Sequence, residues 1–286
     1  MISILVLTKN EEKDLPKCLE SVNWCDDIQI FDSFSEDKTV EIAKQYGAII
    51  TQRKFDGYAS QRNAALESLY FKYPWIFILD ADERIPLDLV NNIRLALANA
   101  PVEVDGFRIR RRDYLGDTWL KYSQISPFYI RLIRSGKGKY NREINEVLEV
   151  EGKVLNIDGY FCHFPFSKGF THWLSKHNNY STMEAKRWIE EHNGDIKFSI
   201  KKAILSKDFN EKRYHQKGLY YKLPGRPLLK WIYMVFWRRS FLDGSAGMTY
   251  ATLQSIYEYF IVLKTHELLS ESRNGNISML PKVIVK

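Results

Sequence analysis

Short apolar runs alternate with amphipathic segments through the first hundred residues of the chain. Apolar side chains dominate Ile2–Leu7, Ile28–Phe31, Ala48–Thr51 and Trp75–Leu79, and each run has the length of a strand. The last run is unbroken, follows Pro74 and precedes charged residues. That pattern is typical of a strand buried on both faces.

The segments between these runs are predicted to be helices, and local signals mark their ends. Asp14 is a candidate N-cap with Pro16 in the first turn, Ser35 is a candidate N-cap for the next helix, and Gly47 closes it. Further helices are predicted over Tyr58–Phe71 and Leu87–Ala98. Strands that alternate with helices predict a parallel sheet with right-handed crossovers.

The pattern changes after Pro101. Further strands are predicted over Gly106–Arg112, Phe128–Arg134, Glu146–Val150 and Val154–Ile157. From Gly169 the pattern is helical, and the tail after Arg273 looks irregular. We find no flexible linker, internal repeat or low-complexity segment.

Composition and charge narrow the class of protein. The 286 residues are 45% hydrophobic and 27% charged, as in a globular protein, and the net charge of +7 favours anionic partners. The three cysteines have no metal or redox spacing and indicate free thiols. The N-terminus lacks the basic region of a signal peptide, and no apolar run approaches the roughly 20 residues of a membrane span. No nucleic-acid-binding module is recognisable, so we expect no nucleic-acid partner.

Acidic residues follow three of the predicted strands. Asp80 and Asp82 follow the fourth, Asp32 ends the second, and Thr8-Lys9-Asn10-Glu11 follows the first. In a parallel sheet these ends share the carboxyl edge, where ligands of open α/β sheets bind. Neighbouring carboxylates repel each other, so we expect a divalent cation with a ligand's phosphates to compensate them.

Basic residues complete the chemistry of a nucleotide-diphosphate site. We expect three basic residues near the carboxyl edge of the predicted sheet, where they would supply cations for phosphate: Arg53, Lys54 and Arg62. The glycine-rich signatures of a dinucleotide fold and of a P-loop are both missing from the sequence. A metal-dependent nucleotide-diphosphate site of another kind is therefore predicted.

These motifs resemble those of family 2 glycosyltransferases with the GT-A fold. The resemblance rests on Thr8-Lys-Asn-Glu, Asp32, Gln61-Arg62-Asn63-Ala64 and Asp80-Ala-Asp-Glu-Arg. Phe241-Leu-Asp-Gly244-x-x-Gly247 adds a likeness to bacterial lipopolysaccharide-core β-1,4-glucosyltransferases. The implied fold is α/β, a mostly parallel sheet flanked by helices. Its catalytic domain would span residues 1–165 (nucleotide half 1–100, acceptor half 101–165), with a helical region over 166–286.

The resemblance implies a role for each motif. The uridine nucleotide of a UDP-sugar donor would be held by Thr8, Asn10, Glu11, Asp32 and Arg62. Asp80 would contact ribose or metal. Asp82, and His163 in Gly159-Tyr-Phe-Cys-His-Phe, would bind Mg²⁺ or Mn²⁺. The alternative for His163 is a core histidine among aromatic residues.

Inverting glycosyl transfer also needs a base that deprotonates the acceptor hydroxyl. Glu143 and Glu146 are the candidates, and we favour Glu146 because it directly precedes an apolar strand. Glu143 lies beside Arg142, which would lower its basicity. The family often has His-Glu here, whereas Asn145 precedes Glu146 in this chain, which leaves the histidine's role open. Both glutamates could also be solvated loop acids.

Two basic segments suggest partners. Residues 228–239 combine aromatic and apolar residues with Lys230, Arg238 and Arg239, which suits a helix in an anionic membrane interface or an oligomer interface. Arg108, Arg110 and Arg112 alternate along one face, which suits an anionic acceptor or a charged edge strand. We expect a peripheral enzyme on the cytoplasmic face of the bacterial inner membrane.

The expected acceptor is a lipid-linked saccharide of the lipopolysaccharide or lipooligosaccharide inner core. A capsule, exopolysaccharide or polyprenyl-linked acceptor is the alternative within the fold. A non-catalytic sugar-binding module would not need Asp32, Asp80 and Asp82 together.

Overall fold

The computed structural model describes residues 1–141, 147–192, 199–206, 208–223 and 225–273. The chain forms two compact units, Met1–Lys168 and Gly169–Lys286, and each is described by itself. Glu143 and Glu146, the two candidate bases, lie outside the described residues.

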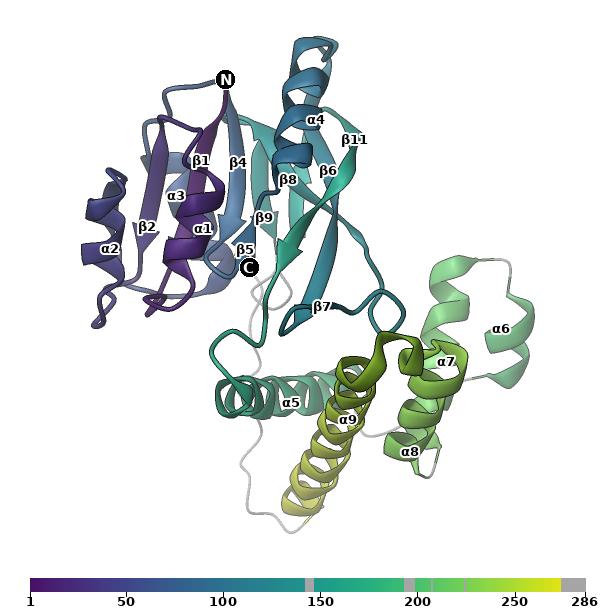
Figure 1. The fold of residues 1–286 in the computed structure, drawn as a ribbon. Coiled ribbons are helices and arrows are strands. Elements are labelled where there is room, and N and C mark those ends of the chain that lie inside the picture. Colours follow the sequence, from purple (N-terminus) through teal and green to yellow (C-terminus); the bar gives the residue numbers. More distant parts are fainter. Residues whose placement is uncertain (142–146, 193–198, 207, 224, 274–286) are drawn as a thin grey trace. The chain divides into compact units, whose positions relative to one another are not determined.

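The first unit is built on one mixed sheet with the strand order β3-β2-β1-β4-β8-β6-β11-β5, and β7 pairs with β6 (Figure 1). Strands β1 to β4 are parallel to one another, β6 is parallel to β11, and β8 runs antiparallel to both β4 and β6. A separate ribbon pairs β9 with β10. The strands are β1 (Ser3–Thr8), β2 (Ile28–Asp32), β3 (Ile49–Gln52), β4 (Trp75–Asp80), β5 (Glu83–Arg84), β6 (Val104–Leu115), β7 (Thr118–Trp119), β8 (Phe128–Arg134), β9 (Gly138–Asn141), β10 (Val147–Val150) and β11 (Lys153–His163).

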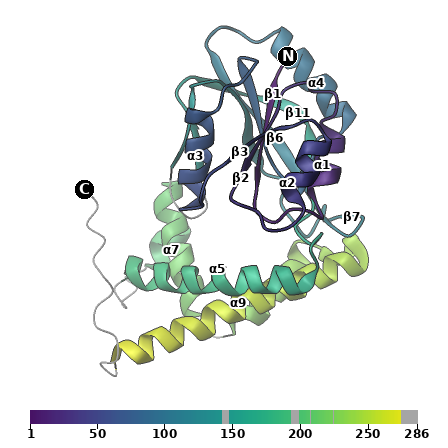
Figure 2. The same cartoon turned by 90° about the vertical axis from the view of Figure 1, so that its left-hand side faces the viewer.

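Helices cover both faces of this sheet. Figure 2 shows α3 on the face opposite to α1, α2 and α4. Two hydrophobic clusters form the core: one joins the sheet to α1, α2 and α4, and the other joins it to α3. The central strands β1 and β4 contribute side chains to both clusters, which explains their unbroken apolar runs. The helices are α1 (Leu15–Ser21), α2 (Thr39–Gln45), α3 (Tyr58–Ser68) and α4 (Leu87–Ala98).

The predicted elements of the first hundred residues are confirmed, but the capping chemistry differs. Asp14 precedes α1 without capping it, because its carboxylate accepts a hydrogen bond from Ser167 instead. The prediction that Ser35 caps the next helix is wrong, since α2 begins at Thr39. Gly47 follows α2 with a φ of +70°, as expected of a residue that ends a helix.

The interpretation of the arginine strand as a charged edge is also wrong. Strand β6 lies between β8 and β11 and pairs with both. It extends from Val104 to Leu115, beyond the predicted segment, because pairing with β11 and β7 continues past both predicted ends. Arg110 and Arg112 therefore project from the interior of the sheet, where no edge needs protection by charge.

The second unit is helical, as predicted. The long helices α5 and α9 pack against each other, and Lys264 of α9 donates hydrogen bonds to Asn178, Ser181 and Thr182 of α5. Arg226 at the start of α8 forms a buried ion pair with Glu258 of α9 at 2.9 Å. Among the described helices, none is long and apolar enough to cross a membrane. The elements are α5 (Phe170–His192), α6 (Ile200–Leu205), α7 (Phe209–Lys222), α8 (Arg226–Ile232), the π-helical turn η1 (Tyr233–Trp237), the 3-10 turn η2 (Ser240–Asp243) and α9 (Gly244–Arg273).

Candidate active site

The carboxyl ends of three adjacent strands meet, as the sequence pattern predicts. In the register of the parallel ladders Leu7 of β1 lies opposite Asp80 of β4, and Thr8 lies opposite Asp32 of β2. The polar residues that follow these strands are therefore neighbours at one edge of the sheet. This is the edge where ligands of open α/β sheets bind.

Asp32 organises this edge through protein hydrogen bonds. Its Oδ1 accepts from Thr8 Oγ1 at 2.8 Å and from Ser35 Oγ at 2.5 Å, and its Oδ2 accepts from Ser35 N and Gln52 Nε2. Burial raises the pKa of Asp32, but the hydrogen bonds from Gln52, Ser35 and Thr8 outweigh it and leave the pKa below its usual value. Asp32 is thus a fixed, ionised acceptor that ties the first two strand ends together.

The loop after β1 carries Asn10 and Glu11. Asn10 has a left-handed backbone with φ of 55°, and its Oδ1 accepts from Glu36 N. Glu11 Oε1 accepts from Lys168 Nζ at 2.6 Å, whereas Glu11 Oε2 is buried with no hydrogen-bond partner among the described residues. Burial raises the pKa of Glu11 to about 7, against the hydrogen bond from Lys168. An unpaired buried acceptor favours a ligand that donates a hydrogen bond here.

Two arginines compensate Asp80. Arg62 Nη2 of α3 lies 2.8 Å from Asp80 Oδ1, and Arg131 Nη2 of β8 lies 3.4 Å from Asp80 Oδ2. Arg131 also lies 2.5 Å from Oε1 of the buried Glu83, whose Oε2 accepts from Asp80 N at 2.9 Å. Burial raises the pKa of Asp80, but Arg62 and Arg131 lower it well below its usual value. The Asp80–Glu83 turn is therefore held by contacts between two acidic side chains and two guanidiniums, although burial raises the pKa of Glu83 to about 7.

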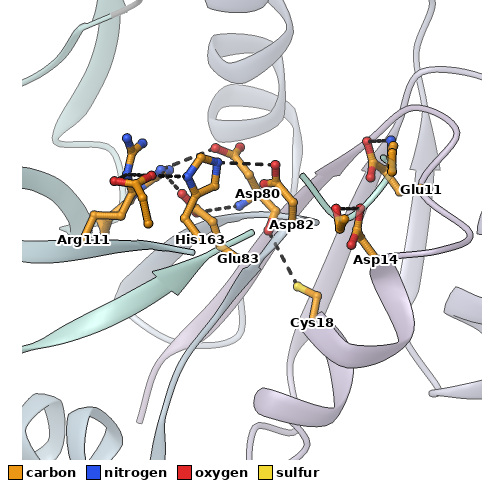
Figure 3. A network of polar contacts seen from close by, with 12 residues as sticks. Glu11, Asp14, Cys18, Asp80, Asp82, Glu83, Arg111 and His163 are labelled. Atoms are coloured by element: carbon orange, nitrogen blue, oxygen red, sulfur yellow. Dashed lines mark hydrogen bonds and ion pairs between the residues drawn. The ribbon is translucent and has the colours of Figure 1, made fainter. Parts of the chain in front are cut away.

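Asp82, within this turn, meets His163 of β11 (Figure 3). His163 Nε2 lies 3.4 Å from Asp82 Oδ2, and His163 Nδ1 lies 2.5 Å from Asp113 Oδ1. Arg111 Nε in turn lies 3.1 Å from Asp113 Oδ1. Burial lowers the pKa of His163, but Asp82 and Asp113 outweigh it and raise the pKa to about 9. His163 therefore lies between two carboxylates.

This arrangement fits part of a metal site. Because Asp113 accepts from Nδ1, Nε2 of His163 is directed at Asp82, which is how carboxylates orient metal-binding histidines. Within the part of the chain that the structure describes, no three acidic, histidine or cysteine side chains form a complete metal cluster. Magnesium-type sites commonly combine one or two protein ligands with substrate phosphates. Two protein ligands are thus enough if a diphosphate supplies the others.

Sequence reasoning missed three residues that shape this site. Arg131 interrupts the apolar Tyr129-Ile-Arg-Leu-Ile segment, and that buried charge was an available signal. Asp113 follows a run of arginines, and nothing local pointed to His163 as its partner. Lys168 gave no signal at all. Arg53, expected to face a phosphate, instead forms an ion pair with Asp56 at 2.7 Å.

Comparisons with known proteins identify the family of this chain. The model of glycosyl transferase family 2 matches residues 3–162. The lipopolysaccharide core biosynthesis glycosyltransferase LpsC of Rhizobium meliloti (strain 1021) is 35% identical over 199 residues, which cover 66% of this chain and 72% of LpsC. An uncharacterized glycosyltransferase of Rickettsia felis (strain ATCC VR-1525 / URRWXCal2) is 23% identical, and the match covers 96% of this chain and 92% of the length of that protein.

Among solved structures, S. aureus TarS 1-349 in complex with UDP-GlcNAc covers 100% of this chain and 95% of its own, with 16% identity and a TM-score of 0.46. The family assignment rests on the sequence matches. The helix-flanked, mostly parallel sheet with acidic strand ends at one edge has the architecture that the resemblance to GT-A glycosyltransferases implies. The chain belongs to glycosyl transferase family 2.

Proposed function

We propose that this glycosyltransferase moves a hexose, with glucose the first candidate, from a UDP-sugar to a lipid-linked saccharide. The proposal depends chiefly on one observation: Asp82, His163 and Asp113 line up at the sheet edge that also holds Asp80. That edge offers two metal ligands beside the strand ends at which a nucleotide is expected.

Asp82 and His163 would hold Mn²⁺ or Mg²⁺ together with the diphosphate. The mixed oxygen and imidazole ligands favour Mn²⁺ over Mg²⁺, which prefers oxygen ligands alone. When bound, the ion would neutralise charge on the leaving diphosphate. Asp113 would keep the Nδ1 proton of His163 in place, so that Nε2 faces the ion. Arg111 would hold Asp113 in turn.

The nucleotide would lie along the ends of β1, β2 and β4. Glu11 Oε2, a buried acceptor without a partner in the described chain, would accept from a ribose hydroxyl or a base N–H. Thr8 and Asp32 would form the floor of this site together with Asn10. Arg62, which is bound to Asp80, would approach the diphosphate from α3.

The general base remains a proposal from sequence. Glu146 would deprotonate the acceptor hydroxyl as the bond from the sugar to the diphosphate breaks on the opposite face, which inverts the configuration. Glu143 is the alternative candidate. The expected transition state resembles an oxocarbenium ion, as in glycoside hydrolysis.

The acceptor class is suggested by the likeness to LpsC, which is described as a lipopolysaccharide core biosynthesis glycosyltransferase. We therefore propose an acceptor of the lipopolysaccharide or lipooligosaccharide inner core. A capsule, exopolysaccharide or polyprenyl-linked glycan is the second candidate, because family 2 includes enzymes for many glycans.

A membrane-facing surface would bring the enzyme to such an acceptor. In the segment from α8 to η2 the large apolar side chains Leu228, Phe236, Trp237, Phe241 and Leu242 are exposed, with Trp237 exposed by 79%. Lys230, Arg238 and Arg239 lie among them in sequence. Exposed aromatic and basic residues together suit the headgroup region of an anionic membrane. We propose peripheral binding at the cytoplasmic face of the inner membrane, and an oligomer interface is the alternative use of this surface.

A donor screen tests the proposed function. Purified protein is mixed with a panel of UDP-sugars, Mn²⁺ and lipopolysaccharide core truncated at successive sugars, and product mass is measured. One UDP-hexose that extends one truncated core supports the proposal. Transfer to a capsule or polyprenyl-linked acceptor alone would favour the second candidate. Binding of sugars without any transfer would contradict both.

A further inference from the structure

Strand β6 presents different chemistry on its two faces. Asp113 and Arg111 point toward His163, as their contacts show. Because side chains alternate along a strand, Arg110 and Arg112 lie on the other face, next to Tyr160 of the paired strand β11. Arg112 is one residue away from Asp113, so this second face begins at the margin of the candidate active site.

Aromatic rings hold both arginines in place. The guanidinium of Arg112 lies 4.4 Å from the ring centre of Trp119 and 4.0 Å from that of Tyr160. The guanidinium of Arg110 lies 4.8 Å from the ring of Phe128, and its Nη1 donates to Tyr160 Oη at 3.3 Å. Lys121 lies 5.7 Å from Trp119. The cations are thus ordered by cation–π contacts, which leave guanidinium edges able to donate to a ligand.

The same residues have unused hydrogen-bonding capacity. Arg112 Nε and Trp119 Nε1 are buried, and neither has a hydrogen-bond partner among the described residues. No carboxylate in the described ranges forms an ion pair with Arg110, Arg112 or Lys121. Buried donors without acceptors and clustered positive charge are unfavourable in isolation, and an anionic ligand relieves both.

We propose that this arginine–aromatic surface, made of Arg110, Arg112, Trp119, Lys121, Phe128 and Tyr160, binds an anionic sugar of the acceptor glycan. The inference rests on the proposed function and names the substrate class that its acceptor contains. Guanidinium groups donate to phosphate or carboxylate oxygens, and the flat aromatic rings pack against the C–H groups of a sugar. A bare anion would use only the first of these features.

The place of the surface predicts how its loss changes kinetics. It is on the face of β6 opposite to His163, so it contacts a sugar remote from the reacting hydroxyl. Arg112→Gln should therefore raise the KM for acceptor about 10- to 100-fold, the range expected for one hydrogen bond to a charged group, and leave kcat nearly unchanged. Arg112→Lys keeps the charge but loses the planar fork, so an intermediate effect is expected.

Arg108 supplies a matched control. It lies four positions before Arg112 on the same strand, is exposed, and has no ring contact or ion pair in the described part of the molecule. Arg108→Gln removes one positive charge from the same protein and should change the acceptor KM less than about 3-fold, in line with the small effect of surface substitutions.

Direct binding tests the inference without catalysis. Calorimetric titration measures the binding of mannose 6-phosphate, glucuronate, mannose and inorganic phosphate to wild type, Arg112→Gln and Arg108→Gln, and UDP binding is measured for each protein. We expect both anionic sugars to bind wild type and Arg108→Gln, and to bind Arg112→Gln at least 10-fold more weakly, while mannose binds none of them. UDP binding should be equal throughout, which shows that the variants fold.

Several results would overturn the inference. If mannose and mannose 6-phosphate bind equally well, the surface does not recognise the anionic group. If inorganic phosphate binds as tightly as the anionic sugars, the surface does not recognise the sugar. If Arg112→Gln binds the anionic sugars as tightly as wild type does, these sugars do not bind at the arginine–aromatic surface. If it instead loses only sedimentation with anionic vesicles, a lipid phosphate is the ligand. In each case intact UDP binding would leave the proposed function standing, whereas failure of wild type to bind UDP would contradict that function itself.

Discussion

Asp113→Asn probes the orientation of His163 without touching either proposed metal ligand. Asp113 is 3% exposed and lies 2.5 Å from His163 Nδ1. Asparagine keeps the size of the side chain, but it can turn its NH₂ group toward Nδ1. That would force the proton of a neutral imidazole onto Nε2 and block the atom proposed to bind the metal.

The expected loss of metal affinity can be taken from other carboxylates that orient metal-binding histidines. Loss of a carboxylate that orients a metal-binding histidine typically lowers metal affinity about 10- to 100-fold, or about 1.4–2.7 kcal/mol. Asp82 and Asp113 also raise the pKa of His163 to about 9, so in wild type a proton competes with the metal below that pH. Asp113→Asn lowers this pKa and weakens the competition. The loss of metal affinity should therefore be larger at pH 8.5 than at pH 7.0.

Calorimetric titration of Mn²⁺ into protein saturated with UDP measures this affinity at both pH values. Asp105→Asn is the matched control, because Asp105 lies near the other end of the same strand and forms an ion pair with Arg134 at 3.0 Å. The control should bind Mn²⁺ like wild type. If Asp113→Asn also binds Mn²⁺ like wild type at both pH values, or if the control loses as much, the role given to Asp113 is refuted.

Three further predictions concern other parts of the chain. Burial raises the pKa of Glu11 to about 7 from 4.5, so the stability linked to its proton is present below pH 4.5 and lost as pH rises through 7. Glu11→Gln should gain up to about 3 kcal/mol over wild type at pH 8 and nothing at pH 4, measured by urea unfolding, and equal pH profiles would contradict this. Glu146→Gln should lower kcat about 10²–10⁴-fold with UDP-sugar binding intact, and the reverse result, with Glu143→Gln inactive, would reassign the base. Glutamate substitutions in the α8–η2 segment should release the protein from anionic vesicles without changing UDP affinity, and a wild type that never sediments with them would favour an oligomer interface; the residues are Lys230, Arg238 and Arg239.

The sequence predicted those features that depend on local pattern. Strands β1, β2 and β4 were recognisable because they are buried and most of their residues are apolar. Their predicted ends fell one residue short at Thr8, Asp32 and Asp80, since these polar residues still pair in the ladder. The convergence of these ends followed from parallel topology alone.

Features that depend on distant residues were not predictable in the same way. Ser35 is of a residue type that commonly caps helices, but its hydroxyl instead donates a hydrogen bond to Asp32 at the end of β2. Asp113 and His163 are 50 positions apart, and only the pairing of β6 with β11 brings them together. Arg131 reaches Asp80 and Glu83 because β8 inserts antiparallel beside β4. The hydrophobic pattern of the sequence does not predict that β8 lies beside β4 or that β6 lies beside β11.

The central claim is that Asp82 and His163 hold a metal required for transfer from a UDP-sugar. Its most direct test is product formation from UDP-glucose and truncated lipopolysaccharide core by wild type and Asp82→Ala, each with Mn²⁺ and with EDTA. We expect wild type to transfer only with metal, and Asp82→Ala to be inactive in both conditions while it melts at the wild-type temperature. Transfer by wild type that EDTA leaves unchanged, or full activity of Asp82→Ala, would contradict the claim.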